Sequence, residues 1–185
     1  PAVVSKGQSH GFSVSLRNDG QAAVILSGSG TSISFTDGID TLRVALGAEG
    51  ALPGGRVTNV VFPSATVPLA MDAGFWPVSL RLRGTENGGS FGQMLVLGDP
   101  IAVVDPAQLA YRPGSIAPTP VSKRSAVAFE VGINNTGGAT VVCNPDSTWI
   151  KFSSGSIVYT ARLDGSRGAD VAPGARTLYF NAVTI

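Results

Sequence analysis

An internal repeat is the sequence feature that most constrains the fold. The tripeptide Val4-Ser5-Lys6 recurs as Val121-Ser122-Lys123, 117 positions later, and this offset then holds without a gap. The other identities at this spacing are, in the first copy, Phe12, Val14, Asn18, Gly20, Ala22, Val24, Thr31, Ile33, Phe35 and Gly38. Self-similarity at one long period indicates two copies of a single structural unit.

The repeat continues less regularly beyond Gly38. Leu46 matches Leu163 at the same offset, whereas Pro53-Gly54 matches Pro173-Gly174 at an offset of 120. A loop that differs in length by three residues explains such a shift. The alignment therefore predicts that the strand after Pro53 in the first copy corresponds to the strand after Pro173 in the second.

The period is longer than half of the chain, so the two copies do not contain the same parts. The segment 105–114 opens the second copy and would correspond to residues ahead of Pro1 in the first. Conversely, the apolar segments in 74–97 have no equivalent in the second copy. We expect a first domain over residues 1–104 that lacks an opening segment, and a second over 105–185 that lacks closing strands.

Alternation of apolar and polar residues predicts β-strands in both copies. Phe12, Val14 and Leu16 alternate with polar residues, and a returning strand follows the turn sequence Asn18-Asp19-Gly20. No window shows a sustained helical stripe of apolar residues. About seven short strands per copy, separated by glycine- and proline-rich turns, are typical of an immunoglobulin-like β-sandwich. The predicted fold is all-β, with two tandem immunoglobulin-like sandwiches, each incomplete relative to the repeat.

Composition and charge narrow the classes of function that the chain can have. The chain has 24 Gly and 12 Pro, and only 14% of its residues are charged, which suits short strands and turns. The formal net charge is +1, and Lys6, Lys123 and Lys151 lie far apart in the sequence. This pattern lacks the basic footprint of a nucleic-acid binder. No apolar run approaches the roughly 18 residues of a membrane-spanning helix, so we expect no membrane span.

The shared turn Asn-x-Gly-x-Ala and the late segment Gly74-Phe75-Trp76-Pro77-Val78 carry a family resemblance. Together with the apolar alternation, they resemble the immunoglobulin-like repeats of bacterial surface proteins, in particular the adhesion-related type called CARDB. The resemblance covers both copies. It implies an extracellular or cell-surface module that spaces, assembles or adheres, that is not an enzyme, and that uses no cofactor.

One segment matches a catalytic formula. Gly88-Gly89-Ser90-Phe91-Gly92 fits the G-x-S-x-G pattern of hydrolase nucleophile elbows, which requires a strand-to-helix turn and a later histidine. The chain has one histidine, His10, which precedes the segment and aligns with Val127. We interpret the segment as a hairpin loop and His10 as a strand residue, and we predict no catalytic residues.

Candidate metal ligands are sparse. Asp37 and Asp40 carry oxygen atoms that suit Ca²⁺, but the second copy has Ser154 and Ile157 at these positions. The single cysteine, Cys143, has no second cysteine and no histidine cluster to complete a metal site. We predict that Cys143 is a small, buried, apolar residue, with an intermolecular disulfide or a reactive thiol as the alternative, and we predict no metal site.

Two kinds of side chain are candidates for ligand contact. Arg81 and Arg83 lie on one face of a predicted strand, where they suit either a solvated sheet face or a carboxylate-bearing partner. Exposed aromatic side chains stack on sugar rings, but we expect both Trp76 and Trp149 to serve the core. Trp149 replaces Ser32 of the first copy and is the better surface candidate of the two. Trp149 is therefore the candidate ligand-contact residue.

Incomplete sandwiches leave strand edges without partners, and such edges promote pairing with another chain. Candidate assembly segments are Pro1, Ala2, Val3 and Val4 at one end and, in the segment 105–120, Leu109 and Tyr111. We expect a structural subunit or spacer of an extracellular bacterial assembly, in which subunits share strands with copies of themselves or with neighbouring repeats. The alternative is an adhesin module that binds a glycan or another surface protein.

Overall fold

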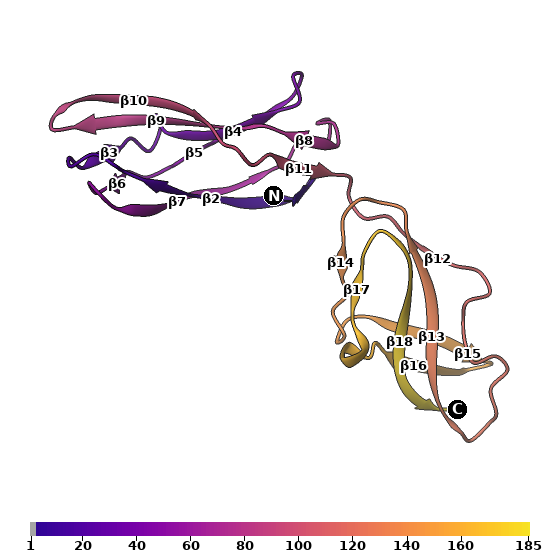
Figure 1. The fold of residues 1–185 in the computed structure, drawn as a ribbon. Coiled ribbons are helices and arrows are strands. Elements are labelled where there is room, and N and C mark those ends of the chain that lie inside the picture. Colours follow the sequence, from indigo (N-terminus) through magenta and orange to yellow (C-terminus); the bar gives the residue numbers. More distant parts are fainter. Residues whose placement is uncertain (1–2) are drawn as a thin grey trace. The chain divides into compact units, whose positions relative to one another are not determined.

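Two compact β-sandwich units make up the chain. The computed structural model describes residues 3–185, apart from the side chain of Ser154. Unit 1 extends to Val104, and unit 2 begins at Asp105. Apart from the short 3-10 helix η1 (Gly165–Arg167), the regular structure of both units consists of strands (Figure 1). The prediction of an all-β sandwich fold is confirmed.

Unit 1 builds its sandwich from three groups of paired strands. Its strands are β1 (Val3–Ser5), β2 (Ser9–Arg17), β3 (Val24–Leu26), β4 (Ser32–Thr36), β5 (Thr41–Ala45), β6 (Gly50–Leu52), β7 (Val57–Thr66), β8 (Gly74–Trp76), β9 (Val78–Glu86), β10 (Gly89–Val96) and β11 (Ile101–Val104). The largest sheet has the order β5-β4-β9-β3-β6, and β10 pairs with β9. β2 pairs with β7, and β1-β11-β8 form the third group.

The core of unit 1 follows from the alternation of its strands. In β9, Val78, Leu80 and Leu82 are buried, while Arg83 at the end of this alternation is exposed. β9 lies at the centre of the large sheet, where it pairs with β3, β4 and β10. In Figure 1, β2 and β7 form a layer that faces β9 and β10. Burial of one face of each layer produces a single hydrophobic core.

Unit 2 has fewer strands. They are β12 (Leu109–Tyr111), β13 (Ala126–Asn135), β14 (Val141–Val142), β15 (Trp149–Ser154), β16 (Ile157–Arg162), β17 (Asp170–Val171) and β18 (Gly174–Thr184). They pair as β12-β13-β18, β14-β17 and β15-β16. The buried core comprises Val127, Phe129, Val131, Ala161, Leu163, Val171, Leu178 and Phe180.

The two units share a hydrogen-bonded turn. In unit 1 the side-chain amide of Asn18 donates to the carbonyl oxygens of Ala22 (2.8 Å) and Leu52 (2.9 Å), and its oxygen accepts from the backbone N–H of Gly20 (3.0 Å). In unit 2 the same three bonds join Asn135 to Ala139 (2.8 Å), Val171 (3.0 Å) and Gly137 (3.0 Å). This asparagine therefore fixes the same turn against the same neighbouring strand in both units.

The strand pairs β2–β7 and β13–β18 correct part of the sequence alignment. Phe12 lies opposite Phe62, and Phe129 lies opposite Phe180, so β7 and β18 correspond at an offset of 118. Both ladders also carry a register shift at the same place, after His10 and after Val127. The predicted offset of 120 after the Pro-Gly pairs is wrong, because core packing and not the turn sequence sets the register of these strands.

The match between Leu46 and Leu163 is supported by backbone contacts. The N–H of Leu46 donates to the carbonyl oxygen of Thr31, and that of Leu163 donates to the equivalent Thr148, both at 2.9 Å. The correspondence of β7 with β18 continues to Ile185, which matches Val67. Residues 68–104, with β8 to β11, consequently have no counterpart among residues 105–185.

Candidate functional site

The candidate assembly residues at the start of the chain belong to the sandwich of unit 1. Pro1 and Ala2 lie outside the described residues. Val3 and Val4 lie in β1, which runs parallel to β11, and Val4 is buried whereas Val3 is 61% exposed. The N–H of Ser5 donates to Nε2 of His10 (3.0 Å), which ties β1 to β2. The described part of this segment is therefore held within its own unit, and His10 is a strand residue.

The second candidate assembly segment forms an edge strand of unit 2. Leu109 and Tyr111 of β12 lie opposite Asn135 and Ile133 of β13. Opposite residues of an antiparallel pair share one face, so both side chains lie on the core side of the sheet. Even so, Leu109 is 47% exposed and Tyr111 is 49% exposed. Unit 2 has no counterpart of β10 in its described residues, so this part of its core side stays open.

Unit 1 has the opposite arrangement, with β10 present and no strand of residues 3–104 paired to the outer edge of β2. Two cavities, of about 540 Å³ and 380 Å³, follow this edge. The larger cavity is lined by residues 11–15 on the β2 side and by Leu97 on the β10 side. The smaller cavity is lined by residues 16–19 on the β2 side and by Phe91 and Leu95 on the β10 side. We call the two cavities together the β2 groove.

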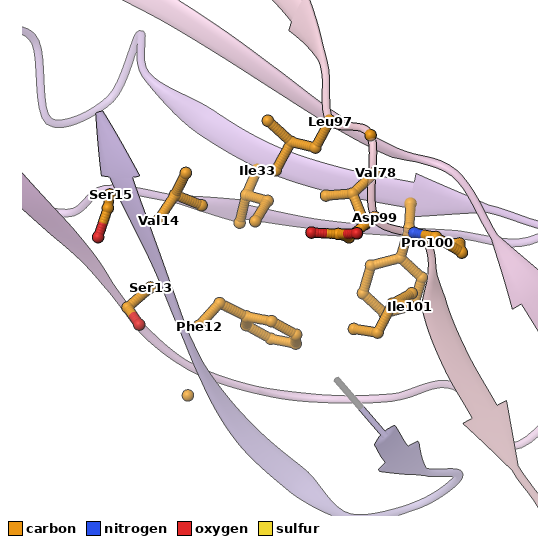
Figure 2. Close-up of a pocket in the computed structure, with 13 residues that line it drawn as sticks. Phe12, Ser13, Val14, Ser15, Ile33, Val78, Leu97, Asp99, Pro100 and Ile101 are labelled. Atoms are coloured by element: carbon orange, nitrogen blue, oxygen red, sulfur yellow. The ribbon is translucent and has the colours of Figure 1, made fainter. Parts of the chain in front are cut away.

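The β2 groove combines apolar walls with an open strand edge. Figure 2 shows its larger cavity, with Phe12 and Val14 on β2, Ile33 and Val78 from the large sheet, and Leu97 close by. Phe91, Leu95 and Leu97 are only partly buried although they pack against the core. A groove of this construction suits an extended peptide, because it offers both unpaired backbone groups and pockets for alternate side chains. The sequence predicted a strand edge without a partner and an apolar groove beside it, but it did not assign them to β2 or to these lining residues.

Unit 2 has its own open edge at β15. In unit 1, β4 lies between β5 and β9, but the equivalent β15 pairs, among the described residues, with β16 alone. Ile33 and Phe35 of β4 are buried, whereas their equivalents Ile150 and Phe152 are only partly buried. No strand of residues 105–185 therefore holds the position that β9 fills in unit 1.

The candidate ligand-contact residue Trp149 is half exposed, and the ammonium group of Lys151 lies 5.1 Å from its ring centroid. Trp149 also lies opposite Arg162, so the outer face of β15 and β16 presents an aromatic ring flanked by cations. Trp76, by contrast, packs against the core of unit 1 and donates from its indole N–H to the carbonyl oxygen of Asp72 (3.0 Å).

The candidate catalytic serine and the candidate calcium ligand take part in a strand and a turn. Ser90 lies in β10 directly after the β9–β10 turn, and β10 continues as a strand, so the nucleophile-elbow geometry does not form. The carboxylate of Asp37 accepts from the backbone N–H groups of Ile39 (2.9 Å), Asp40 (2.6 Å) and Asp72 (2.8 Å). The bond from Asp72, followed by those from Asp40 and Ile39, lowers the pKa of Asp37. The part of the chain that the structure describes holds no cluster of three or more potential metal-ligating side chains.

Cys143 lies against the core of unit 2, and the two arginines of β9 lie on its outward face. Cys143 is partly buried and packs against the core of unit 2, and this burial raises the pKa of its thiol, with a further contribution from Asp170. Arg81 and Arg83 follow the outward face of β9, where Arg81 is partly and Arg83 largely exposed.

Comparisons with known proteins do not identify a family for this chain. No family model and no curated protein matches the sequence. Among solved structures, the chain is similar to the CsuC–CsuE chaperone–tip adhesion subunit pre-assembly complex from the archaic chaperone-usher Csu pili of Acinetobacter baumannii. The TM-score is 0.32 and the identity 11%, over 100% of this chain and 85% of that chain. A likeness at this level assigns no function. Within residues 3–185 we find no helix of the length and apolarity needed to cross a membrane.

Proposed function

We propose that the chain is a non-catalytic structural module of an extracellular bacterial assembly, either a filament or an array of surface repeats of the CARDB-like kind. The observation that carries the proposal is that each unit has, within residues 3–185, a sheet edge that is covered in the other unit. No described strand pairs with the outer edge of β2, where unit 2 has β12. No described strand pairs with the outer edge of β15, where unit 1 has β9. Modules of this construction extend one another by adding strands across their boundaries, and head-to-tail contacts of this type build open arrays.

The backbone pleat shows which groups of β15 are available for such pairing. The carbonyl oxygen of Thr148 accepts from Leu163 on the β16 side. Since backbone groups alternate in direction along an antiparallel strand, the N–H and C=O of Ile150 face β16, and those of Trp149 and Lys151 face the open edge. Proline at position 151 would remove a donor from this edge without removing one from the β15–β16 ladder.

Light scattering and negative-stain electron microscopy over a concentration series test this proposal. We expect oligomers that grow with concentration. Lys151→Pro should reduce this growth strongly, whereas Lys151→Ala, which keeps the N–H, should leave it near the level of the wild-type chain. A chain that stays monomeric at the highest concentration would contradict strand sharing between copies. Growth that Lys151→Pro leaves unchanged would contradict the role of the β15 edge.

The exposed face of β15 supports a second candidate function, an adhesin module that binds a glycan. Trp149 is half exposed beside Lys151, and an exposed tryptophan can stack on a sugar ring. Glycan binding should quench tryptophan fluorescence in the wild-type chain and in a Trp76→Phe variant, and it should be lost in Trp149→Ala. Quenching that persists in Trp149→Ala would contradict a glycan site at this residue.

A further inference from the structure

We propose that the outward face of the large sheet of unit 1 binds an extended, acidic polypeptide segment, whose alternate carboxylates pair with arginine side chains. The face lies on the side of β4, β5, β9 and β10 that turns away from the core and from the layer of β2 and β7 (Figure 1). A strand that pairs with the edge of a sheet lies in the plane of that sheet. Strand addition at any edge therefore leaves this face accessible, and the inference goes beyond the proposed function.

Three arginines come together on this face. In the ladder, Arg81 of β9 lies opposite Ser32 of β4, and Arg43 of β5 lies opposite Ser34 of the same strand. Nε of Arg43 donates to Oγ of Ser32 (3.0 Å), so the Arg43 side chain runs diagonally across β4 toward Arg81. Arg83 follows two residues after Arg81 and therefore shares its side of the sheet. We call the outward surface of these four strands, with its three arginines, the arginine face.

A glycine lets the Arg83 side chain lie across the neighbouring strand. Gly92 of β10 lies opposite Arg83, and a Cβ on this glycine would lie 2.5 Å from Nη1 of Arg83. The guanidinium group therefore occupies the space that a side chain at position 92 would fill. Gly92 thus allows the Arg83 cation to lie flat on the sheet, beside the cation of Arg81, instead of extending into solvent.

The three cations have no acidic partner among the described residues. None of the outward positions of β4, β5, β9 and β10 carries aspartate or glutamate. Within the described structure, no carboxylate lies at ion-pair distance from any of the three guanidinium groups. Like charges on neighbouring strands repel one another, so a bound anion relieves this repulsion and also accepts hydrogen bonds. The arginine face is therefore complementary to a ligand that carries several negative charges.

The spacing of the arginines favours an extended polypeptide over a glycan. Arg81 and Arg83 are two residues apart on a strand, a distance of about 6.7 Å. An extended peptide repeats the side chains of one face at the same distance, so acidic residues at alternate positions meet both arginines at once. Arginine binds a carboxylate through two parallel N–H···O bonds, and this geometry depends on the positions of both groups. The outward positions of these four strands also carry no aromatic ring on which a sugar could stack.

Apolar side chains beside the arginines favour glutamate over aspartate in the bound segment. Met94 and Val96 of β10 are 63% and 71% exposed and lie opposite Arg81 and Ser79 on the same face. The two methylene groups of a glutamate side chain can cover this apolar surface while its carboxylate reaches a guanidinium group. Burial of that surface adds to the electrostatic attraction, which alone is weak at an exposed site. The segment that we infer has glutamate at every second position and an extended conformation.

Two synthetic peptides of equal composition test the proposal with the full chain, by fluorescence anisotropy. Each has four glutamates and eight serines. The alternating peptide has glutamate at every second position from its first residue, and the control peptide has it at every third position, so that successive carboxylates lie on opposite faces. We expect saturable binding of the alternating peptide, about fivefold tighter than that of the control, since one further exposed ion pair contributes up to this factor. Absence of saturable binding by the alternating peptide, or equal binding of the two peptides, would overturn the proposal.

Matched variants locate the binding on the arginine face. Arg81→Gln and Arg83→Gln should each weaken binding of the alternating peptide about threefold to fivefold, whereas Arg56→Gln should leave it unchanged. Arg56 is the control because it is also exposed but lies next to β7, in the opposite layer. Arg81→Lys keeps the charge and loses the planar fork, so it should also bind more weakly than the wild type. Equal weakening by all three glutamine variants would show general attraction between charges and would overturn the site.

An acidic polysaccharide is the alternative ligand, and polygalacturonate is its probe. This polymer carries carboxylates on sugar rings and lacks the side-chain repeat of an extended peptide. We expect its binding to be independent of Arg81. Binding of polygalacturonate that is lost in Arg81→Gln, together with peptide binding that is not, would identify a glycan as the ligand and would overturn the assignment to a polypeptide.

The same samples separate this inference from the proposed function. The titrations use a concentration at which light scattering shows a monomer. Lys151→Pro, which removes a donor from the β15 edge, should bind the alternating peptide like the wild type. Oligomer growth in a chain that does not bind the peptide would overturn this inference alone. Peptide binding by a chain that never self-associates would support the arginine face and contradict only the sharing of strands.

Discussion

The most informative single residues are the two asparagines that end β2 and β13. Their side chains make the same three hydrogen bonds, but Asn135 is 2% exposed and accepts a fourth from Gln108, whereas Asn18 is partly exposed. A buried polar group left without its partner costs more than one that water can reach. Asn18 and Asn135 therefore hold the same turn but differ in how deeply their side chains are buried.

Replacement of these asparagines by alanine tests that difference. Asn135→Ala should lower the free energy of unfolding of unit 2 by about 2–3 kcal/mol, because it leaves buried carbonyl and N–H groups unpaired. Asn18→Ala should cost unit 1 about 1 kcal/mol, since water can replace part of the bonding. Urea denaturation of both variants measures the two values. Equal losses would contradict the role that we assign to burial.

The carboxylate of Asp37 predicts that the stability of the folded chain depends on pH. Its carboxylate accepts three backbone N–H bonds, which lower its pKa from the ordinary value of 3.8 in the folded chain. A lowered pKa means that the stabilisation is present above the unfolded-state pKa and is lost as the pH falls through the folded-state pKa. Asp37→Asn should therefore lower the melting temperature near neutral pH and leave it close to that of the wild type in strong acid. An equal difference at both pH values would exclude this carboxylate as the cause.

Among the elements, β9 depends on a close approach to β3. A Cβ on Gly84 would lie 1.9 Å from the carbonyl oxygen of Ile25, so the pairing of β3 with β9 requires glycine here. We expect Gly84→Ala to destabilise unit 1 by about 2 kcal/mol or more, the range for overpacking. Gly98→Ala is the control, since a Cβ there meets nothing within 4 Å. Thermal unfolding of both variants checks the prediction, and similar melting temperatures would contradict it.

The strands also show where sequence reasoning succeeds and where it stops. The alternation of Phe12, Val14 and Leu16 and the Asn18 turn predicted β2 and its return, because local pattern and core burial agree there. The correspondence of β7 with β18 was misaligned, because Pro-Gly pairs recur in a chain rich in both residues. Its register is set instead by Phe62 and Phe180, whose partners across the ladder are distant in sequence.

For the whole molecule, the repeat predicted that each copy lacks parts of the other, but it could not locate the β2 groove. That groove depends on which strand edges stay unpaired and which side chains surround them. The sequence shows that Ser15 takes the place of Gly132 in unit 1. Only the structure shows that a Cβ on Gly132 would lie 2.6 Å from Cβ of Ser115.

The open edge of β15 predicts a difference in hydrogen exchange between the two units. Lys151 in β15 and its equivalent Ser34 in β4 direct their N–H groups to the same side of the strand. β9 pairs with β4 on that side, and no described strand pairs with β15 there. The amide of Lys151 should exchange rapidly and that of Ser34 slowly, while Ile150 and Ile33, which face paired strands, should both be protected. Slow exchange at Lys151 would show that this edge is covered.

The contact between Gly132 and Ser115 has a consequence for the exchange of parts between the two units. A Cβ on Gly132 would lie 2.6 Å from Cβ of Ser115, and the N–H of Gly132 donates to Oγ of Ser115 (2.8 Å). Unit 1 has Ser15 at this position, although the two units share the turn, the bulge and the ladder register. The two copies of the repeat are therefore no longer interchangeable parts: a chimaera that carried β2 in place of β13 would keep the asparagine turn and displace Ser115.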